Sequence, residues 1–329
     1  MRLAVIGAGA VGGTIAALAE HAGHDVTIVA RGEQRDAIRA NGLSLAGAFG
    51  HMTGHPHVVD TIGTADRFDL VVVAVKAHQT AAAVAPIELS STTPLLVVQN
   101  GFGGFDAVRD RFPENPAAIG LALFGATIAE PGRIHATYAA SLVVGGDRNA
   151  VNMTRSILST QLRVRLTRNP AGAAWTKVLI NSVNAMPALT GLSVQRTIAH
   201  RGLRRIVTAL MREVAQVGYA RGEKFADLGA VSARDVRFLS VVPLRWGQLI
   251  PLRLAQKMGV VPNYASTLQS IKRGRTTEVD HLSGAIVDAA AEISRTAPIN
   301  HTVTELIREV ARTGEFMTPD EVVDRIPLR

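Results

Sequence analysis

The chain has 329 residues, of which 47% are hydrophobic and 19% charged, and this composition indicates a globular protein large enough for two domains. It contains no cysteine, which excludes disulfides, thiol catalysis and thiolate metal sites, and we expect no metal centre. The sequence contains no run of about 20 apolar residues, so it predicts no membrane span. An N-terminus that begins in a strand leaves no signal peptide to remove, so we expect a cytoplasmic protein without a membrane partner.

The formal charge of +8 would suit a nucleic-acid-binding protein, but the arginines are scattered along the chain. The densest group mostly shares one helical face and lacks interleaved aromatic residues: Arg196, His200, Arg201, Arg204, Arg205 and Arg212. This pattern is typical of a solvated basic helix, so we expect no nucleic-acid partner. Some of the positive field can instead attract an anionic cofactor and substrate.

The first predicted element is a short buried strand, Leu3–Ile6, followed by a G-x-G-x-x-G turn and a helix over Val11–Glu20. In this context the first glycine permits a tight turn, the second lets a pyrophosphate approach, and the third lets the helix pack on the strand. The helix N-terminus then faces the phosphates. We expect the whole turn to bind a dinucleotide: Gly7, Ala8, Gly9, Ala10, Val11 and Gly12. An ordinary glycine-rich turn is the alternative.

A second parallel strand is predicted at Asp25–Ala30, and the residue after it distinguishes NAD from NADP. An acidic residue there would bind the ribose 2′-hydroxyl, whereas an arginine accommodates a 2′-phosphate. The chain has Arg31 there, with Arg35 one turn later, so we expect NADP (NADPH) as the cofactor. Glu33 is a contrary sign, and a surface arginine at a strand end is the alternative.

Two β-branched runs, Asp69–Val75 and Thr93–Val98, predict central strands of a parallel sheet, and Lys76 and Asn100 follow them. Ligands of such sheets bind outside the carboxyl ends of the strands, so we expect both residues to lie at the cofactor site. A surface lysine and a simple Asn-Gly turn are the alternatives. Further short strands are expected at residues 43–45 and 57–59, and a helix at 77–85.

The pattern changes from residue 117 onward. Short strands between residues 117 and 144 predict an extension of the sheet, followed by a helix at 152–162 and a strand at 163–166. We therefore expect an α/β fold, with an N-terminal Rossmann-type doubly wound domain (1–169) and an all-α C-terminal domain (170–329). Its helices are expected at 172–190, 197–221, 263–273, 275–295 and 300–312, with a loop-rich stretch at 222–262. Their apolar composition suits a homodimer.

The helix expected at 172–190 carries Lys177, Asn181 and Asn184 on one face. Polar side chains aligned on a buried-looking face need partners, because unpaired buried polar groups are costly. The stripe is therefore either an interdomain hydrogen-bond network or a substrate-facing set in which the lysine serves as an acid.

Three polar residues mark helix starts further along the chain. Asn263 and Ser266 bracket one turn, and Glu278 begins the next helix, where an acidic residue is often only a cap. Together with the earlier motifs, however, they resemble the ketopantoate reductase (2-dehydropantoate 2-reductase) family over essentially the whole chain. The matching pieces are Gly7-Ala-Gly-Ala-Val-Gly12, Arg31, Val75-Lys76-Ala77, Gln99-Asn100-Gly101, Pro131-Gly132-x-Ile134-His135, Trp175-x-Lys177-x-x-x-Asn181, Asn263-x-x-Ser266 and Gly274-Arg-x-Thr-Glu278-Val-Asp280.

This resemblance implies NADPH-dependent reduction of a small 2-oxo acid, ketopantoate to pantoate, on the route to pantothenate and coenzyme A. It implies Lys177 as the general acid and Glu278 as its partner or as the partner of a substrate hydroxyl. Asn100 would lie near the nicotinamide, and Lys76 would reach the cofactor ribose or the substrate. The carboxylate and hydroxyl groups of the substrate would be held by Asn181, Asn184, Asn263 and Ser266.

Two features depart from the family pattern. The second asparagine of the helix usually follows the first by four residues, where this chain has Ala185, and the segment 222–262 is longer than a minimal member needs. Both lie on the expected substrate side, so a related 2-oxo acid remains an alternative substrate. A 3-hydroxyacid dehydrogenase and a non-catalytic NADP-binding sensor are the alternative functions.

Overall fold

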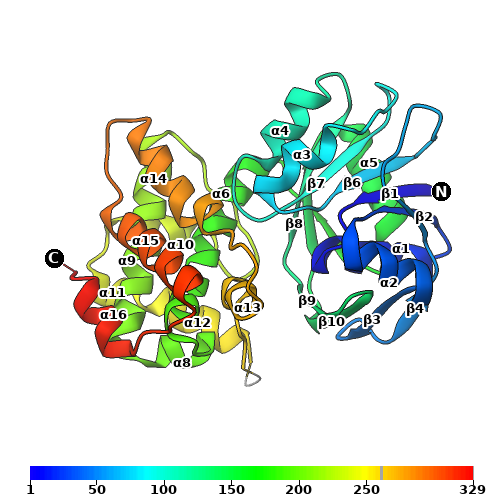
Figure 1. Cartoon of the computed structure of the whole chain (residues 1–329). Coiled ribbons are helices and arrows are strands. Elements are labelled where there is room, and N and C mark those ends of the chain that lie inside the picture. The colour runs from blue at the N-terminus through cyan, green and yellow to red at the C-terminus, as the bar shows by residue number, and fades with distance from the viewer. Residues whose placement is uncertain (260–261, 329) are drawn as a thin grey trace. The chain divides into compact units, whose positions relative to one another are not determined.

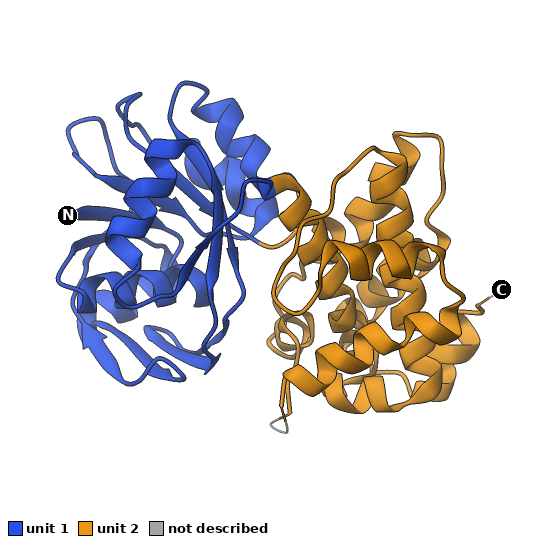
Figure 2. Cartoon of the chain, turned by 180° about the vertical axis from the view of Figure 1, so that it is seen from behind, with its two compact units in different colours: residues 1–99, 103–170 blue, residues 100–102, 171–329 orange. Residues whose placement is uncertain are grey.

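The computed structural model describes residues 1–259 and 262–328, which form two compact units (Figure 2). Unit 1 comprises Met1–Gln99 and Gly103–Pro170, and unit 2 comprises Asn100–Phe102 and Ala171–Arg329. The predicted fold class, a doubly wound α/β domain followed by a helical domain, is confirmed. Among the described helices, none combines the length and the apolar character needed to cross a bilayer.

Unit 1 is built on an eight-stranded sheet in the order β12-β11-β8-β7-β6-β1-β2-β5 (Figure 1). Its neighbouring strands are parallel except for the antiparallel pair β8 and β11. The bounds are β1 (Arg2–Ile6), β2 (Asp25–Val29), β5 (His57–Val59), β6 (Leu70–Val73), β7 (Leu95–Val98), β8 (Ala117–Ala122), β11 (Leu142–Gly146) and β12 (Val164–Leu166). Parallel pairing brings the carboxyl ends of β1, β2, β6 and β7 to one edge, where binding sites of open sheets form.

Helices cover both faces of this sheet, which explains why its strands are continuous apolar runs. Leu3 and Val5 of β1 enter a core shared with α1 (Ala10–His21) and α5 (Arg148–Leu158). Ala4 and Ile6 enter a second core, shared with α3 (Thr80–Val84) and α4 (Gly104–Arg111). The remaining helices of unit 1 are α2 (Gly32–Asn41) and the 3₁₀ turn η1 (Ala77–Gln79).

The expectation that all strands between residues 117 and 144 extend the main sheet is wrong. β9 (Gly125–Glu130) and β10 (Arg133–Tyr138) join a separate four-stranded sheet, β4-β3-β10-β9, with β3 (Leu43–Gly47) and β4 (Met52–Gly54). The reason is packing against α1. The Cδ1 atom of Ile134 lies 2.1 Å from where a Cβ of Gly13 would stand, so the bare helix surface at this glycine admits the Ile134 side chain.

Unit 2 is helical and is organised around α9 (Arg201–Ala220), whose apolar stripe is buried. The surrounding helices are α6 (Pro170–Asn181), η2 (Ser182–Asn184), α7 (Ala185–Thr190), α8 (Val194–Ala199), α10 (Ala233–Val241), α11 (Leu244–Gly247), α12 (Leu249–Lys257), α13 (Ser266–Lys272), η3 (Val279–His281), α14 (Ser283–Ala291), α15 (Pro298–Thr313) and α16 (Pro319–Arg325). One continuous hydrophobic core joins most of them.

The helix expectations for unit 2 need three corrections. The helix at 172–190 is interrupted by η2, and the one at 197–221 divides at His200, whose Nδ1 caps α9. Residues 275–282 contain only the short turn η3.

The stretch 222–262 is not simply loop-rich, because it contains α10, α11 and α12; residues 260–261 of it lie outside the described part. Ser232 and Asp235 form a capping box that starts α10. Pro251 lies in the first turn of α12, where a missing N–H breaks no helical bond.

Candidate active site

The glycine-rich turn between β1 and α1 forms an open cradle in unit 1. Gly7 has a φ of +105°, and a Cβ added there would lie 2.7 Å from Cγ1 of Val75. A Cβ at Gly12 would lie 2.0 Å from the carbonyl oxygen of Gly7. A Cβ at Gly9, by contrast, would meet nothing within 4 Å. The fold itself therefore requires glycine at positions 7 and 12, whereas Gly9 leaves room for a ligand.

The N-terminus of α1 begins at this open space. Gly9 is the N-cap residue, and across residues 1–259 and 262–328 no side chain caps this helix end. Ala10 and Val11 form its first turn and are partly exposed. The backbone N–H groups and positive dipole of a helix N-terminus attract an anion. The residues present therefore fit the pyrophosphate of a dinucleotide.

Gln34 of α2 holds the turn in place, a role that sequence reasoning missed. Its Nε2 donates to the Ala8 carbonyl at 2.7 Å, and its Oε1 accepts the Gly132 N–H at 3.1 Å. Gln34 thus links the glycine turn to the turn between β9 and β10. The Pro131-Gly132 motif was the available signal, and this contact gives it a structural explanation.

Arg31 lies two residues after the end of β2, where the sequence predicts the residue that distinguishes NADP from NAD. It is the exposed N-cap residue of α2. Arg35 is engaged elsewhere, because its Nε pairs with Asp36 and its Nη1 with Asp60, both at 2.8 Å. Of the two arginines noted in the sequence, Arg35 is thus held in ion pairs with neighbouring carboxylates, whereas Arg31 is exposed.

Lys76 lies three residues after the end of β6 and is partly buried. Its backbone is fixed by Gln99, whose Nε2 donates to the Val75 carbonyl at 2.9 Å and to Thr80 Oγ1 at 2.6 Å. A Cβ at Gly104 would overlap Oε1 of Gln99, so this glycine makes room for the amide. Gln99 therefore positions Lys76 at the carboxyl edge of the sheet.

The three residues after Gln99 belong to unit 2, although β7 belongs to unit 1. The Phe102 ring lies 4.8 Å from the Trp175 ring of α6, and the Phe102 N–H donates to the His281 carbonyl at 3.3 Å. Gly101 has a φ of +81°, and a Cβ added there would lie 2.1 Å from the same carbonyl oxygen. Through these contacts Asn100 belongs to unit 2, which also contains Lys177 and Glu278.

Lys177 of α6 is partly buried, two residues after Trp175. Burial lowers the pKa of its amine to about 8, while the negative charge of Glu278, the residue before η3, opposes this shift. A lysine with such a pKa can donate a proton and recover it near neutral pH. Unit 2 therefore contains a lysine, Lys177, that can exchange a proton near neutral pH and that interacts with the carboxylate of Glu278.

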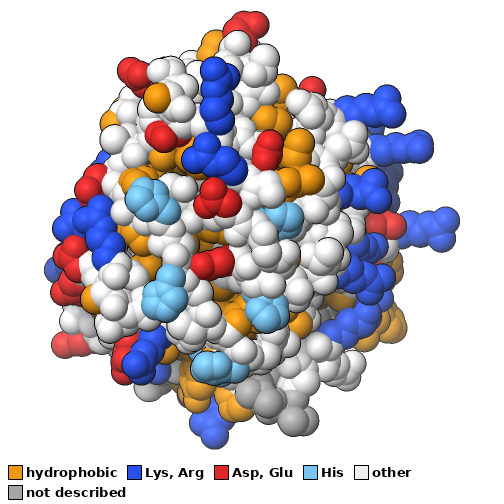
Figure 3. Space-filling view, turned by 90° about the vertical axis from the view of Figure 1, so that its right-hand side faces the viewer, with side chains coloured by type: hydrophobic (Ala, Val, Ile, Leu, Met, Phe, Trp, Pro, Cys, Tyr) orange, Lys and Arg blue, Asp and Glu red, His pale blue; other side chains and the backbone are white. Residues whose placement is uncertain are grey.

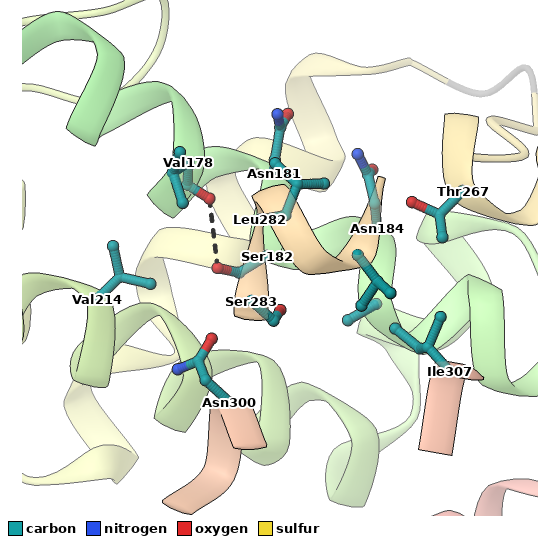
Figure 4. A pocket seen from close by; sticks show the side chains of 12 residues that line it. Val178, Asn181, Ser182, Asn184, Val214, Thr267, Leu282, Ser283, Asn300 and Ile307 are labelled. Carbon is teal, nitrogen blue, oxygen red and sulfur yellow. Dashed lines mark hydrogen bonds between the residues drawn. The ribbon is translucent and has the colours of Figure 1, made fainter. Parts of the chain in front are cut away.

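Asn181 and Asn184 continue the polar stripe through η2 and line a small pocket (Figure 4). In a 3₁₀ turn residues three apart eclipse each other, so Asn184 stands in line with Asn181. Figure 4 shows both side chains extending to the same side. Ala185, the position expected from the family pattern, is buried in the core. Because residues 182–184 form a 3₁₀ turn, Asn184 aligns with Asn181 although the two are three residues apart and not four.

Asn263 and Ser266 are placed near α13 but differ in exposure. The backbone of Asn263 is held by α8, since its carbonyl accepts the Val194 N–H at 2.9 Å. Ser266 is exposed, whereas its neighbour Thr267 is buried and lines the pocket with Asn181 and Asn184. Sequence reasoning missed Thr267 and three other polar residues of this pocket, Ser182, Ser283 and Asn300.

A second hollow, of about 500 Å³, lies in unit 1 at the opposite edge of the sheet, where β2 and β5 begin. His24, His55 and His57 line it together with Glu20 and Asp25. Figure 3 shows a face of the molecule on which histidine side chains gather. Within the described residues no group of three or more His, Asp or Glu side chains could hold a metal ion. This hollow is distinct from the glycine cradle.

Comparison with known proteins places these features in a family context. The model "Ketopantoate reductase PanE/ApbA" matches residues 3–149, and its C-terminal counterpart matches residues 169–311. A 2-dehydropantoate 2-reductase of Pyrococcus horikoshii is 25% identical, covering 95% of this chain and 99% of the relative. The crystal structure of a PanE/ApbA family ketopantoate reductase from Ralstonia eutropha JMP134 superimposes with a TM-score of 0.80 at 27% identity, covering 95% of this chain and 99% of the other.

A further structural neighbour is a D-mandelate dehydrogenase in complex with NADH and anilino(oxo)acetate. It has a TM-score of 0.79 at 19% identity and covers 95% of this chain and 99% of its own. At this identity the similarity concerns the fold.

Proposed function

The chain belongs to the ketopantoate reductase family, and from this premise we propose that Lys177 is the general acid of its reaction. The protein is an NADP-dependent oxidoreductase of the 2-dehydropantoate 2-reductase type, which reduces 2-dehydropantoate to pantoate in pantothenate and coenzyme A biosynthesis. The observation that carries the assignment of the acid is the buried Lys177 amine, whose pKa falls to about 8 beside Glu278.

The Lys177 ammonium would donate a hydrogen bond to the 2-oxo oxygen of the substrate and then transfer its proton to that oxygen. It would also stabilise the negative charge that develops there, an effect usually worth several kcal/mol. Glu278 would favour the charged form of Lys177 and set its position. Bound NADPH supplies the hydride.

The cofactor would be held by the glycine cradle, with the pyrophosphate at Gly9 and the α1 N-terminus. Arg31 would receive the 2′-phosphate, and Lys76 would reach the cofactor ribose or the substrate. The open space at Gly9 and the exposure of Arg31 support these roles. The complete proposed set for the cofactor is Gly7, Ala8, Gly9, Ala10, Val11, Gly12, Arg31, Lys76 and Asn100.

The substrate would be held by amides and a hydroxyl of unit 2. Asn181 and Asn184 would bind its carboxylate or hydroxyl groups, since their side chains extend to the same side of the pocket (Figure 4). Asn263 and Ser266 would complete the set from the start of α13. Asn100 would lie near the nicotinamide, since it follows the carboxyl end of β7 by two residues.

The decisive experiment is an NADPH-oxidation assay across a panel of 2-oxo acids that includes 2-dehydropantoate and phenylglyoxylate. Lys177→Ala should lower kcat by roughly 10²- to 10⁴-fold, the usual contribution of a general acid. Its NADPH affinity should stay unchanged. Lys257→Ala, which removes an exposed lysine of α12, is the matched control. Full turnover by Lys177→Ala would refute the role of Lys177.

The panel also separates the alternatives. Preference for an aromatic 2-oxo acid would indicate a mandelate dehydrogenase-like specificity, for which the fold similarity is the motivation. Oxidation of a 3-hydroxy acid with NADP⁺, measured in a separate assay as NADPH formation, would indicate a different dehydrogenase. NADPH binding without turnover of any acid would indicate a sensor.

We also propose residues 1–169 as the NADP-binding domain and residues 170–329 as the substrate and dimerisation domain, working in the cytoplasm as a homodimer. Exposed apolar side chains of the α10–α12 region support self-association: Phe238, Val241, Trp246 and Leu249. Light scattering of the protein and of a Trp246→Ser/Leu249→Ser variant tests this, because only the variant should be monomeric.

A further inference from the structure

The pocket beneath the Asn181 and Asn184 side chains has a polar floor that none of the proposed roles uses. Its free volume is about 10 Å³, which is room for about one water molecule. Three buried polar side chains contribute to its lining: Ser182 of η2, Ser283 of α14 and Asn300 of α15. Ser182 is distant in the sequence from Ser283 and Asn300, which lie on consecutive helices.

Asn300 is 1% exposed, and its orientation is determined by its surroundings. Its Nδ2 donates to Glu213 Oε2 at 2.9 Å and to the Leu210 carbonyl at 3.4 Å. Glu213 also accepts the backbone N–H groups of Ile299 and Asn300, so its carboxylate acts as an acceptor toward this helix end. The amide nitrogen of Asn300 must therefore face Glu213, and the amide oxygen must face the pocket.

The amide oxygen of Asn300 has no hydrogen-bond partner within the described part of the chain. Figure 4 shows it pointing toward the hydroxyl groups of Ser182 and Ser283. The Ser182 hydroxyl makes only a long bond, 3.5 Å, to the Val178 carbonyl. A buried acceptor without a donor is costly, and pockets with several polar partners commonly hold an ordered water. The unpartnered oxygen and the neighbouring hydroxyl groups can therefore bind a molecule that carries an O–H donor.

We propose that this pocket binds one water molecule, which donates to Asn300 Oδ1 and bridges to the hydroxyl groups of Ser182 and Ser283. The water ties α15 and α14 to η2, the 3₁₀ turn that aligns Asn184 with Asn181. Asn300, Ser182 and Ser283 are then positioning residues for the 2-oxo acid. This part rests on the proposed function; the water site itself does not.

The water site is tested by a high-resolution crystal structure of the full-length protein. The expected result is a density peak about 2.6–3.2 Å from Asn300 Oδ1. A dry pocket would overturn the proposal. A second crystal, soaked with 2-dehydropantoate, shows whether the O–H donor is a water molecule or a hydroxyl group of the substrate. Persistence of the isolated peak supports the water, whereas continuous density from a substrate hydroxyl in its place would overturn it.

The positioning role is tested by Ser283→Ala and by Ser283→Val, which fills the pocket. Each should raise KM for the 2-oxo acid about three- to tenfold, the effect of one hydrogen bond, with kcat and NADPH affinity nearly unchanged. Thr208→Val is the matched control, because Thr208 is also buried but its hydroxyl bonds within α9 to the Arg204 carbonyl. An unchanged KM in both Ser283 variants, or the same rise in the control, would overturn the positioning role while leaving the crystallographic result to decide the water.

Discussion

Phe102 packs against Trp175 with ring centroids 4.8 Å apart, although 73 positions separate the two residues in the chain. This contact anchors the segment Asn100–Phe102 to the helical unit. Since Trp175 lies in the middle of α6, two residues before Lys177, the aromatic pair ties this part of the helix to the segment that carries Asn100.

We predict that Phe102→Ala lowers kcat/KM by up to about tenfold, because an aromatic pair contributes roughly 0.5–1.5 kcal/mol beyond its buried area. Steady-state kinetics and thermal unfolding measure the two effects separately. Phe49→Ala, which removes an aromatic pair with Phe124 in unit 1, is the control. Equal losses of activity in both variants would show that the Phe102 contact is only structural.

The pKa of Lys177 predicts the pH dependence of the reduction. The ammonium is the acid, so kcat/KM should be constant below pH 8 and fall above an apparent pKa of about 8. Glu278 raises this pKa, so Glu278→Gln should move the alkaline limb to lower pH. A pH–rate profile in which the limb stays in place or moves to higher pH in Glu278→Gln would contradict the pairing.

The same shift affects stability. Between pH 8 and the ordinary lysine value of 10.5 the unfolded chain binds more protons than the folded one, so stability rises with pH in this window. The cost of holding the charged amine in the fold is fully present below pH 8. Compared with Lys177→Met, the wild-type protein should therefore gain stability from pH 8 to 10.5, as measured by denaturant unfolding at fixed temperature.

Arg31 should determine the choice of cofactor. Arg31→Asp is expected to weaken NADPH binding about 10- to 100-fold, the contribution of a hydrogen-bonded charge pair, with little effect on NADH. Fluorescence titration with both nucleotides measures the ratio. Arg67→Asp, an exposed substitution elsewhere in unit 1, should leave the ratio unchanged. An unaltered preference in Arg31→Asp would identify Arg31 as a surface residue.

Two of the three glycines of the cradle, Gly9 and Gly12, should respond differently to an added methyl group. Gly12→Ala places a Cβ 2.0 Å from the Gly7 carbonyl oxygen and should lower unfolding stability by about 1–3 kcal/mol. Gly9→Ala meets no protein atom within 4 Å, so it should fold normally but lose at least about tenfold in NADPH affinity through contact with the pyrophosphate.

Thermal unfolding without nucleotide and an NADPH titration check both expectations. Gly63→Ala, where an added Cβ also meets nothing within 4 Å, should change neither quantity. Normal NADPH affinity in Gly9→Ala would argue against binding at this turn.

Several site features could be predicted from the sequence because they depend on nearby residues. The glycine turn followed from its spacing between an apolar run and a helix, and Arg31 from its place after the second strand. The spacing of Asn184 was harder to interpret, because the sequence pattern does not reveal that residues 182–184 form a 3₁₀ turn. The polar floor of the pocket escaped prediction, since Ser182, Ser283 and Asn300 meet only through helix packing.

The sequence by itself determined the class of the fold and predicted the dinucleotide turn, because strand and helix periodicity and turn chemistry are local properties. The candidate acid, Lys177, followed from the resemblance to the family. The tertiary structure decided what surrounds those residues. It brought Asn100 into the unit of Lys177, buried the Lys177 amine near Glu278, and turned the Asn300 oxygen toward the pocket. Desolvation and hydrogen bonding depend on atoms brought together from distant positions, which local patterns do not specify.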